Sequence, residues 1–391
     1  MNPANPMNEE REPQRFEFID ALRGWAILGV LWCHAGLFQK VPGFFEDAVT
    51  SGSRGVQLFY LVSAFALFWS MNSRKSREIY PLRNYFVRRF FRIAPMFYIA
   101  VALYMYTGGI DRVNYAPEGV GAFHVMTTMT FVNGWIPSHI NSVVPGGWSV
   151  AVESNFYFLL PLIFLFVKNL RSALWLLWGV LVAVWGMNRG LHSLLQKVYA
   201  NELSTDNPLH KIYQFMLDNY EYSWLPNQMG VFALGVVFYF LFIQNNLSKF
   251  DKRDSFLLLV LSLSFMWPLL REYHLGFMPN HFLFGAAFLL FVWSLSIHPW
   301  VFFVNPVVRY IGQISFSLYL LHFAFFNSVR ELLGAGFFVP EKNIFRYAAG
   351  FIVLLALSVV AASVSYYLIE VPGIALGRKL IKTWERERPA A

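Results

Sequence analysis

Two ionisable residues, Arg23 and His34, lie eleven positions apart in an otherwise long apolar stretch. Eleven residues of an α-helix make three turns plus about 20°, so both side chains project from one face, roughly 16 Å apart along the axis. A neutral imidazole can take a proton from a hydroxyl and so help it attack an acyl carbon. Ionisable residues inside a membrane span usually face a polar interior. With Asp20 just upstream, the pair predicts a functional lining; a histidine that only bonds between helices is the simpler alternative.

Two further polar stripes lie in later apolar stretches. Ser149, Glu153 and Tyr157 follow at four-residue spacing and therefore share a helix face. There Glu153 would position or deprotonate an incoming hydroxyl, unless it is only a carboxylate tolerated at a helix N-terminus. The second stripe consists of Ser315, Tyr319 and His322. Hydrogen bonding between helices is its simpler interpretation.

The segment 73–92 is strongly basic and leads into another apolar stretch. Its basic residues are Arg74, Lys75, Arg77, Arg83, Arg88, Arg89 and Arg92. Alone, they would form an anchor that touches anionic lipid. Arg88 and Arg92, however, are one helical turn apart, and guanidinium groups suit phosphate oxygens. These two, with Arg89, fit a phosphate-bearing donor such as a coenzyme A thioester, and Glu370 is expected to pair with an arginine of this segment.

The composition is that of a membrane protein. Hydrophobic residues make up 57% of the chain and only 14% are charged, whereas soluble domains have about 25% charged residues. Apolar stretches long enough to cross the bilayer recur, without an alternating β-barrel pattern, so we expect an all-α integral membrane protein. The net charge of +8 therefore marks a cytoplasmic side and not a nucleic-acid partner. One cysteine, Cys33, excludes an intramolecular disulfide, and the nine scattered histidines predict no metal site.

Charge decides the topology. Eleven apolar stretches are candidate spans, at 18–38, 55–71, 93–107, 120–133, 149–167, 173–187, 228–243, 256–270, 281–297, 312–330 and 346–368. If the short, polar stretch 120–133 does not cross, 20 lysines and arginines lie inside and 10 outside; if it crosses, the split is 16 to 14. The positive-inside rule favours the first arrangement. We therefore predict ten spans with cytoplasmic N and C termini, and a re-entrant or interfacial segment near 120–133.

This topology sets the expected organisation. The chain divides into a disordered cytoplasmic tail, a ten-helix membrane domain and a basic cytoplasmic tail, with no fused soluble domain, at 1–17, 18–372 and 373–391. Arg23 then lies near the cytoplasmic end of the first span and His34 in its outer half. Segments 108–148 and 188–227 are the two large outer segments, and the second is acidic and aromatic enough to meet a polar ligand.

These blocks together resemble the acyltransferase 3 family of integral membrane acyltransferases, over about residues 16–372. The opening block 18–34, FIDALRGWAILGVLWCH, has the family's arginine and histidine separated by ten residues, with an aspartate just upstream. The other matching blocks are GVQLFYLVSAFALF, RRFFRIAPMFY, WSVAVESNFY, ISFSLYLLH and SYYLIEVP. Each block is weak by itself, but six in this order are specific.

The resemblance implies ten spans and transfer of an acyl group, often acetyl, from cytoplasmic acyl-CoA to a hydroxyl at the outer face. Family acceptors are commonly sugars of surface polysaccharide, lipopolysaccharide or peptidoglycan, and sometimes macrolides. His34 matches the family's essential histidine and Arg23 its arginine, while Arg88 and Arg92 match the arginine pair thought to hold the donor.

The chain also departs from the family pattern. Ala64 and Ser154 stand where members often have a glycine and a second acid, so a two-carboxylate mechanism is not expected. Many members carry a fused esterase-like domain after the last span. Here nineteen residues follow Pro372, so we expect this chain to act alone, as a homo-oligomer, or with a separate periplasmic partner.

The resulting hypothesis is an acyl-CoA-dependent O-acyltransferase of the bacterial cytoplasmic (inner) membrane that modifies a surface polysaccharide or lipopolysaccharide. His34 would act as general base or be acylated itself, and Glu153 would help to place the carbohydrate acceptor. Arg23 would orient His34 through intermediates, steady the donor, or only pair with Asp20. A membrane transporter is the alternative from another class, because polar faces also line substrate pathways. Neither inverted repeats nor matching broken spans favour it, and a membrane scaffold is a third possibility.

Overall fold

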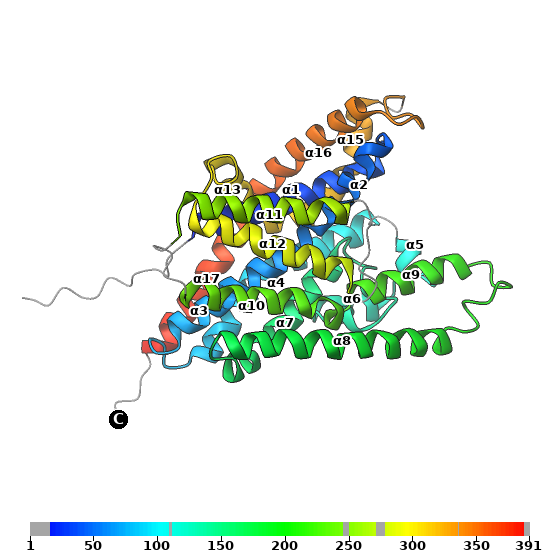
Figure 1. Ribbon diagram of the computed structural model, residues 1–391. Helices are drawn as coiled ribbons and strands as arrows, with labels where there is room; N and C mark the ends of the chain where they lie inside the picture. The colour runs from blue at the N-terminus through cyan, green and yellow to red at the C-terminus, as the bar shows by residue number, and fades with distance from the viewer. Residues whose placement is uncertain (1–15, 109–111, 245–249, 271–277, 335, 387–391) are drawn as a thin grey trace, which may run out of the picture.

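The computed structural model describes residues 16–108, 112–244, 250–270, 278–334 and 336–386, and every regular element in these ranges is helical (Figure 1). The elements in chain order are α1 (Glu17–His34), η1 (Ala35–Leu37), α2 (Gly43–Ser51), η2 (Gly52–Arg54), α3 (Gly55–Arg74), α4 (Pro81–Thr107), α5 (Arg112–Tyr115), α6 (Ala122–Met129), η3 (Asn133–Trp135), α7 (Gly147–Phe166), α8 (Leu170–Val198), α9 (His210–Ser223), α10 (Leu225–Gln244), α11 (Lys252–Leu270), α12 (Asn280–Ile297), α13 (Pro306–Gln313), α14 (Ser315–Leu321), η5 (His322–Phe325), α15 (Phe326–Leu333), α16 (Ile344–Ser365), η6 (Tyr366–Glu370) and α17 (Val371–Arg386). The all-α prediction is confirmed for these residues.

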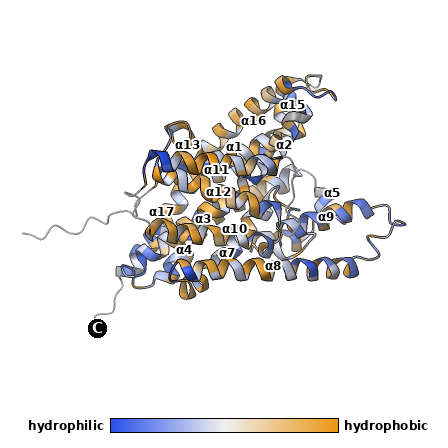
Figure 2. Ribbon diagram, viewed as in Figure 1, coloured by the Kyte–Doolittle hydropathy of each residue, from blue (hydrophilic) through white to orange (hydrophobic). Residues whose placement is uncertain are grey.

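Eight helical segments in the described ranges are long and apolar enough to cross a membrane. They coincide with eight of the ten expected spans, and apolar residues dominate their middle parts while polar residues gather toward the ends of the bundle (Figure 2). The chain is therefore a multi-pass membrane protein. The helix α6, within 120–133, has 8 residues and rises only about 12 Å, too little to cross about 30 Å of hydrocarbon.

The two other expected spans differ from the eight. The helix α1 has 18 residues and carries Glu17, Asp20 and Arg23, so it is more charged than a simple lipid-facing span. The stretch 312–330 is discontinuous: Ile314 separates α13 from α14, and a 3₁₀ turn follows α14 before α15 begins. The count of ten spans and the cytoplasmic placement of the termini remain predictions.

The helices around α1 and α10 form the core of the bundle. α10 packs against α3, α8 and α12, and most of its side chains are buried, whereas α8 and α11 leave most of theirs exposed, as lipid-facing helices do. α13 lies directly against α1. The two backbones approach so closely at Gly312 that any side chain there would collide with the backbone carbonyl of Asp20. Close backbone approach thus positions the start of α14, with its polar stripe, beside α1.

The two ends of the bundle differ in composition. At one end, called here the arginine-rich end, the connection from α3 to α4 meets α17, which packs along α4. The expected basic tail 373–391 is therefore helical as far as Arg386. At the other end, called the α9 end, α5, α9 and the last turns of α8 extend beyond the remaining helices (Figure 1). The expected outer segment 188–227 is thus largely helical.

Candidate active site

A cavity of about 970 Å³ runs through the bundle from the arginine-rich end. Its walls come from α1, α3, α4, α7, α13, α14, η6 and α17. Of the residues predicted from the sequence, those that line it are Asp20, Arg23, Arg88, Arg89, Arg92, Ser149, Glu153, Tyr157, Ser315 and Tyr319. Ser149, Glu153 and Tyr157, called here the α7 stripe, all line the cavity, so the prediction that they share one helix face is confirmed. One space thus joins the arginines to acid and hydroxyl groups deep in the bundle.

The deep part of the cavity is polar. Arg23 lies 4.0 Å from Asp20 and within electrostatic reach of Arg92 and Glu153. The hydroxyl of Ser63 on α3 donates to the Glu153 carboxylate at 2.6 Å. A cation on α1 and an anion on α7 therefore line the same cavity, and such groups can stabilise charge that develops on a bound ligand.

Ser149 and Tyr319 meet in the same cavity. The Ser149 Oγ lies 2.7 Å from the Tyr319 hydroxyl, which donates its own proton to the carbonyl of Gly146 at 2.9 Å. Gly146 has a φ of +75°, a backbone conformation that favours glycine. This local turn starts α7 and holds the first turn of the α7 stripe against α14.

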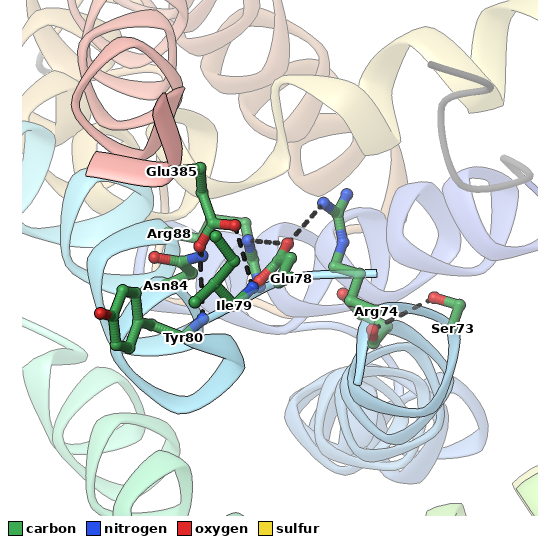
Figure 3. Close-up of polar contacts among 9 residues, drawn as sticks. Ser73, Arg74, Glu78, Ile79, Tyr80, Asn84, Arg88 and Glu385 are labelled. Atoms are coloured by element: carbon green, nitrogen blue, oxygen red, sulfur yellow. Dashed lines mark hydrogen bonds and ion pairs between the residues drawn. The ribbon is translucent and has the colours of Figure 1, made fainter. Parts of the chain in front are cut away.

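The arginines at the mouth of the cavity have carboxylate partners that the sequence analysis only partly predicted (Figure 3). Arg88 forms two hydrogen bonds with Glu78, at 2.7 and 3.2 Å, and Arg74 reaches the same carboxylate at 3.3 Å. Arg92 pairs with the buried Glu370 at 2.6 Å, which confirms the expected pairing of Glu370 with an arginine of the basic segment.

Arg89 differs from its neighbours. It lines the cavity, contacts no carboxylate within the described ranges, and its Nε is buried without a hydrogen-bond partner there. Sequence reasoning favoured Arg88 and Arg92 as phosphate ligands. Among the described residues, however, Arg89 is the member of the three that has no carboxylate partner. An anionic ligand would therefore meet Arg89 first and compete with carboxylates for the other two.

The sequence analysis missed two acids at this mouth. Glu78 is the one acidic residue in the basic segment 73–92, and that contrast was the available signal. Glu385, on α17, accepts hydrogen bonds from the backbone N–H groups of Ile79 and Tyr80 at 2.9 and 3.3 Å and from the Asn84 side chain at 2.8 Å (Figure 3). It caps the start of α4 and ties α17 across the mouth.

His34 does not line the cavity, in contrast to Arg23. It pairs instead with His322: Nδ1 of His34 lies 2.8 Å from Nε2 of His322, and the two rings are within 4° of parallel. Tyr319 connects the pair to the cavity, because its side chain lines the cavity while its carbonyl oxygen lies 2.7 Å from Nδ1 of the buried His322. The pair thus lies next to the cavity, beyond Tyr319.

These contacts fix where the protons of the neutral pair lie. A carbonyl oxygen only accepts, so Nδ1 of His322 carries a hydrogen and its Nε2 has a lone pair. Nδ1 of His34 must then donate to that lone pair, which leaves Nε2 of His34 as a free proton acceptor. An imidazole oriented in this way can accept a proton from a hydroxyl. Within the described ranges, no three His, Cys, Asp or Glu side chains come together as metal ligands.

Comparison with known proteins agrees with this chemistry. The family model described as an acyltransferase domain matches residues 16–363. The chain therefore belongs to the acyltransferase 3 family, which favours an enzyme over a transporter or a scaffold.

Several curated proteins are similar to this chain. A Staphylococcus aureus (strain COL) protein named "Putative O-acetyltransferase" is 25% identical over 403 residues, covering 95% of this chain and 59% of the relative. Acyltransferase MdmB of Streptomyces mycarofaciens is 26% identical over 189 residues, covering 44% of this chain and 45% of the relative. Peptidoglycan O-acetyltransferase OatA of Listeria monocytogenes is 25% identical over 190 residues, covering 43% of this chain and 28% of the relative. This chain thus spans 59% of the length of the S. aureus relative. No solved structure matches it.

Proposed function

We propose that the chain transfers an acyl group, taken here as acetyl, from cytoplasmic acyl-CoA to a hydroxyl of a carbohydrate on the outer face of a bacterial cytoplasmic membrane. The observation that carries the proposal is the cavity that links Arg88, Arg89 and Arg92 to Arg23, Glu153 and Tyr319. The His34–His322 pair lies directly beyond Tyr319. The names of the O-acetyltransferase relatives support the acetyl group, and that of OatA supports a cell-wall sugar as acceptor.

The donor enters at the arginine-rich end. Its phosphates bind the unpaired Arg89 and displace Glu78 from Arg88, because a phosphate offers the same paired oxygens as a carboxylate with more charge. Arg92 keeps Glu370 as a partner and adds to the local positive charge. The acyl-bearing arm then extends along the cavity past Arg23, which steadies the thioester end.

Chemistry takes place at His34. Its Nε2 accepts the proton of the acceptor hydroxyl while that oxygen attacks the thioester carbonyl carbon. The carbon–sulfur bond then breaks, and the departing thiolate receives the proton from His34, so the products are an ester and free coenzyme A. His322 holds the imidazole in the productive tautomer throughout. A route in which His34 is first acylated gives the same products.

The donor arm and the acceptor must meet beyond Tyr319. The cavity reaches Tyr319 and Ser149, and the histidine pair adjoins Tyr319 on the other side. We place the acceptor at the α9 end, so that the two substrates approach His34 from opposite sides. Glu153, held by Ser63 in the cavity wall, stabilises the polar end of the donor arm and the incoming hydroxyl.

Transfer of radiolabel from acetyl-CoA to peptidoglycan fragments by the purified protein tests this function. The expected result is transfer by wild type and a loss of at least a hundredfold in His34→Ala, in line with removal of a general base. His192→Ala is the matched control, because His192 is an exposed histidine whose ion-pair partner within the described residues is Glu221. Wild-type turnover in His34→Ala would refute the role of His34.

A further inference from the structure

A second polar cluster lies at the α9 end of the bundle, and the mechanism above does not use it. This outer polar cluster consists of Arg54, Gln57, Tyr222 and Gln228. Its members come from the end of η2, the start of α3, the end of α9 and the start of α10. Gln57 and Gln228 are fully buried, while Arg54 and Tyr222 are half-buried and form its accessible side.

The hydrogen bonds of the cluster leave one strong acceptor unused. Nε2 of Gln228 donates to the carbonyl of Tyr222 at 2.7 Å, so Oε1 of Gln228 faces Gln57 and accepts from its Nε2 at 2.9 Å. These two contacts fix the orientation of both amides. Oε1 of Gln57 is therefore the atom that lacks a partner among the described residues, although it is fully buried. Such an orphan is costly, and native proteins rarely keep one without a purpose.

A donor is unused at the same place. The Tyr222 hydroxyl oxygen accepts from Nη1 of Arg54 at 2.8 Å and from Nε2 of Gln57 at 3.1 Å. Both of its lone pairs are then occupied, and no acceptor within the described residues takes its proton. The bond from the arginine cation also makes this O–H a stronger donor. A free donor and a free acceptor, side by side, match a ligand hydroxyl, which both accepts and donates.

The surroundings suit a carbohydrate. The half-buried Trp148 ring lies 5.7 Å from that of Tyr222, and aromatic side chains of this kind offer apolar faces to sugar rings. The Arg54 guanidinium lies over the rings of Tyr222 and Phe284, at 5.5 and 5.7 Å, and contacts no carboxylate in the described part of the chain. A half-buried cation without an acid partner in a membrane protein points to function.

The cluster also lies close to the histidine pair. Gly55, next to Arg54, packs against Ala26 and Val30 of α1, and Gly52 packs against Cys33, the neighbour of His34. Trp148 is followed directly by Ser149, which contacts Tyr319. The start of α3 and the end of α1 are therefore at the same level of the bundle.

We propose that the outer polar cluster is the acceptor subsite, where Tyr222 and Gln57 together hold one hydroxyl of a carbohydrate and place a neighbouring hydroxyl at His34. The inference rests on the proposed acyl transfer and assigns its acceptor side. The residues concerned set specificity and position; they take no part in bond making.

Steady-state kinetics of Tyr222→Phe and Gln57→Leu with the peptidoglycan fragments test the assignment. Each variant should raise the acceptor KM by about tenfold or more, the effect of losing one or two hydrogen bonds to a ligand. Turnover at saturating acceptor and hydrolysis of acetyl-CoA without acceptor should stay at wild-type values. Tyr213→Phe is the matched control, because it removes from the same helix a hydroxyl whose hydrogen-bond partner in the described part of the chain is Glu118.

Binding of the same fragments, measured without acetyl-CoA, separates the two proposals. If wild type binds the fragments and Tyr222→Phe binds them about tenfold more weakly, the subsite stands even where no transfer is seen, and only the transfer proposal fails. Unchanged acceptor KM and binding in both variants would overturn the subsite. Loss of acetyl-CoA hydrolysis in folded variants would also overturn it, because the cluster would then serve the donor.

Discussion

The pairing of His34 with His322 makes a sharp prediction about the second histidine. In His322→Leu, Nδ1–H of His34 loses the lone pair to which it donates, while the ring of His34 keeps its contact with Phe323, whose ring centroid lies 4.6 Å away. In His322→Gln, the amide oxygen of glutamine offers an acceptor at about the same distance from the backbone. The two variants thus separate the proton acceptor from the packing volume.

The expected loss of kcat in His322→Leu follows from the Nδ1–H group of His34, which is left without an acceptor. A buried donor without a partner costs about 1–3 kcal/mol. In the leucine variant, the tautomer of His34 with its proton on Nε2 is therefore favoured by that free energy. In this tautomer Nε2 cannot accept a proton, so His34 does not act as a base. The fraction of enzyme with a productive tautomer then falls by roughly 5- to 150-fold, and kcat falls with it. The KM for acetyl-CoA should change little, because the arginines at the mouth of the cavity do not contact His322.

Radiolabel transfer from acetyl-CoA at saturating acceptor measures this effect. We expect His322→Leu to lose kcat as described and His322→Gln to stay within about tenfold of wild type. Thermal unfolding in detergent shows whether each variant is folded. A leucine variant with wild-type kcat would refute the reasoning, as would a folded glutamine variant that is as impaired as the leucine variant.

Three further predictions concern other parts of the chain. Glu78→Gln should lower the acetyl-CoA KM by roughly fivefold, because the carboxylate that competes for Arg88 is removed at a cost to the resting protein of about 1 kcal/mol; an unchanged or raised KM contradicts this. Burial lowers the pKa of His139 to about 4, so the fold loses at most about 2 kcal/mol as the pH falls from 7 to 5, and little above pH 7; His139→Gln should flatten the profile of Tm against pH, and an unchanged slope would count against it. Gly312→Ala should destabilise the protein by about 1–3 kcal/mol through its clash with α1, whereas Gly179→Ala, in open space on α8, should not lower Tm; equal Tm values would disprove the close packing.

The sequence predicted the parts of the site that depend on helix periodicity. The stripe of Ser149, Glu153 and Tyr157 follows from four-residue spacing, and all three positions face the cavity. Helix periodicity also predicted one shared face for Arg23 and His34. Arg23 lines the cavity, but His34 lies at the last turn of α1, where its contact with His322 determines its position. Spacing along one helix cannot reveal which other helix supplies the partner.

Partners from distant segments were beyond the sequence analysis. Glu385 lies 301 positions after Asn84, and only the packing of α17 along α4 brings them together. Gln57 and Gln228, in two apolar stretches, read as isolated polar residues, because each needs the other to make an amide network. The discontinuity at Ile314 has Gly312 two residues before it, but a single glycine in an apolar stretch does not by itself predict a break.

The central claim is that acyl-CoA on one side of the membrane reaches His34 through the bundle and acylates an acceptor on the other side. Proteoliposomes that hold radiolabelled acetyl-CoA on the arginine-rich side and peptidoglycan fragments on the α9 side test it directly. We predict label on the fragments with wild type, none with His34→Ala, and none when acetyl-CoA is supplied only on the α9 side. Label transfer that needs donor and acceptor on the same side, or that persists in His34→Ala, would contradict the account.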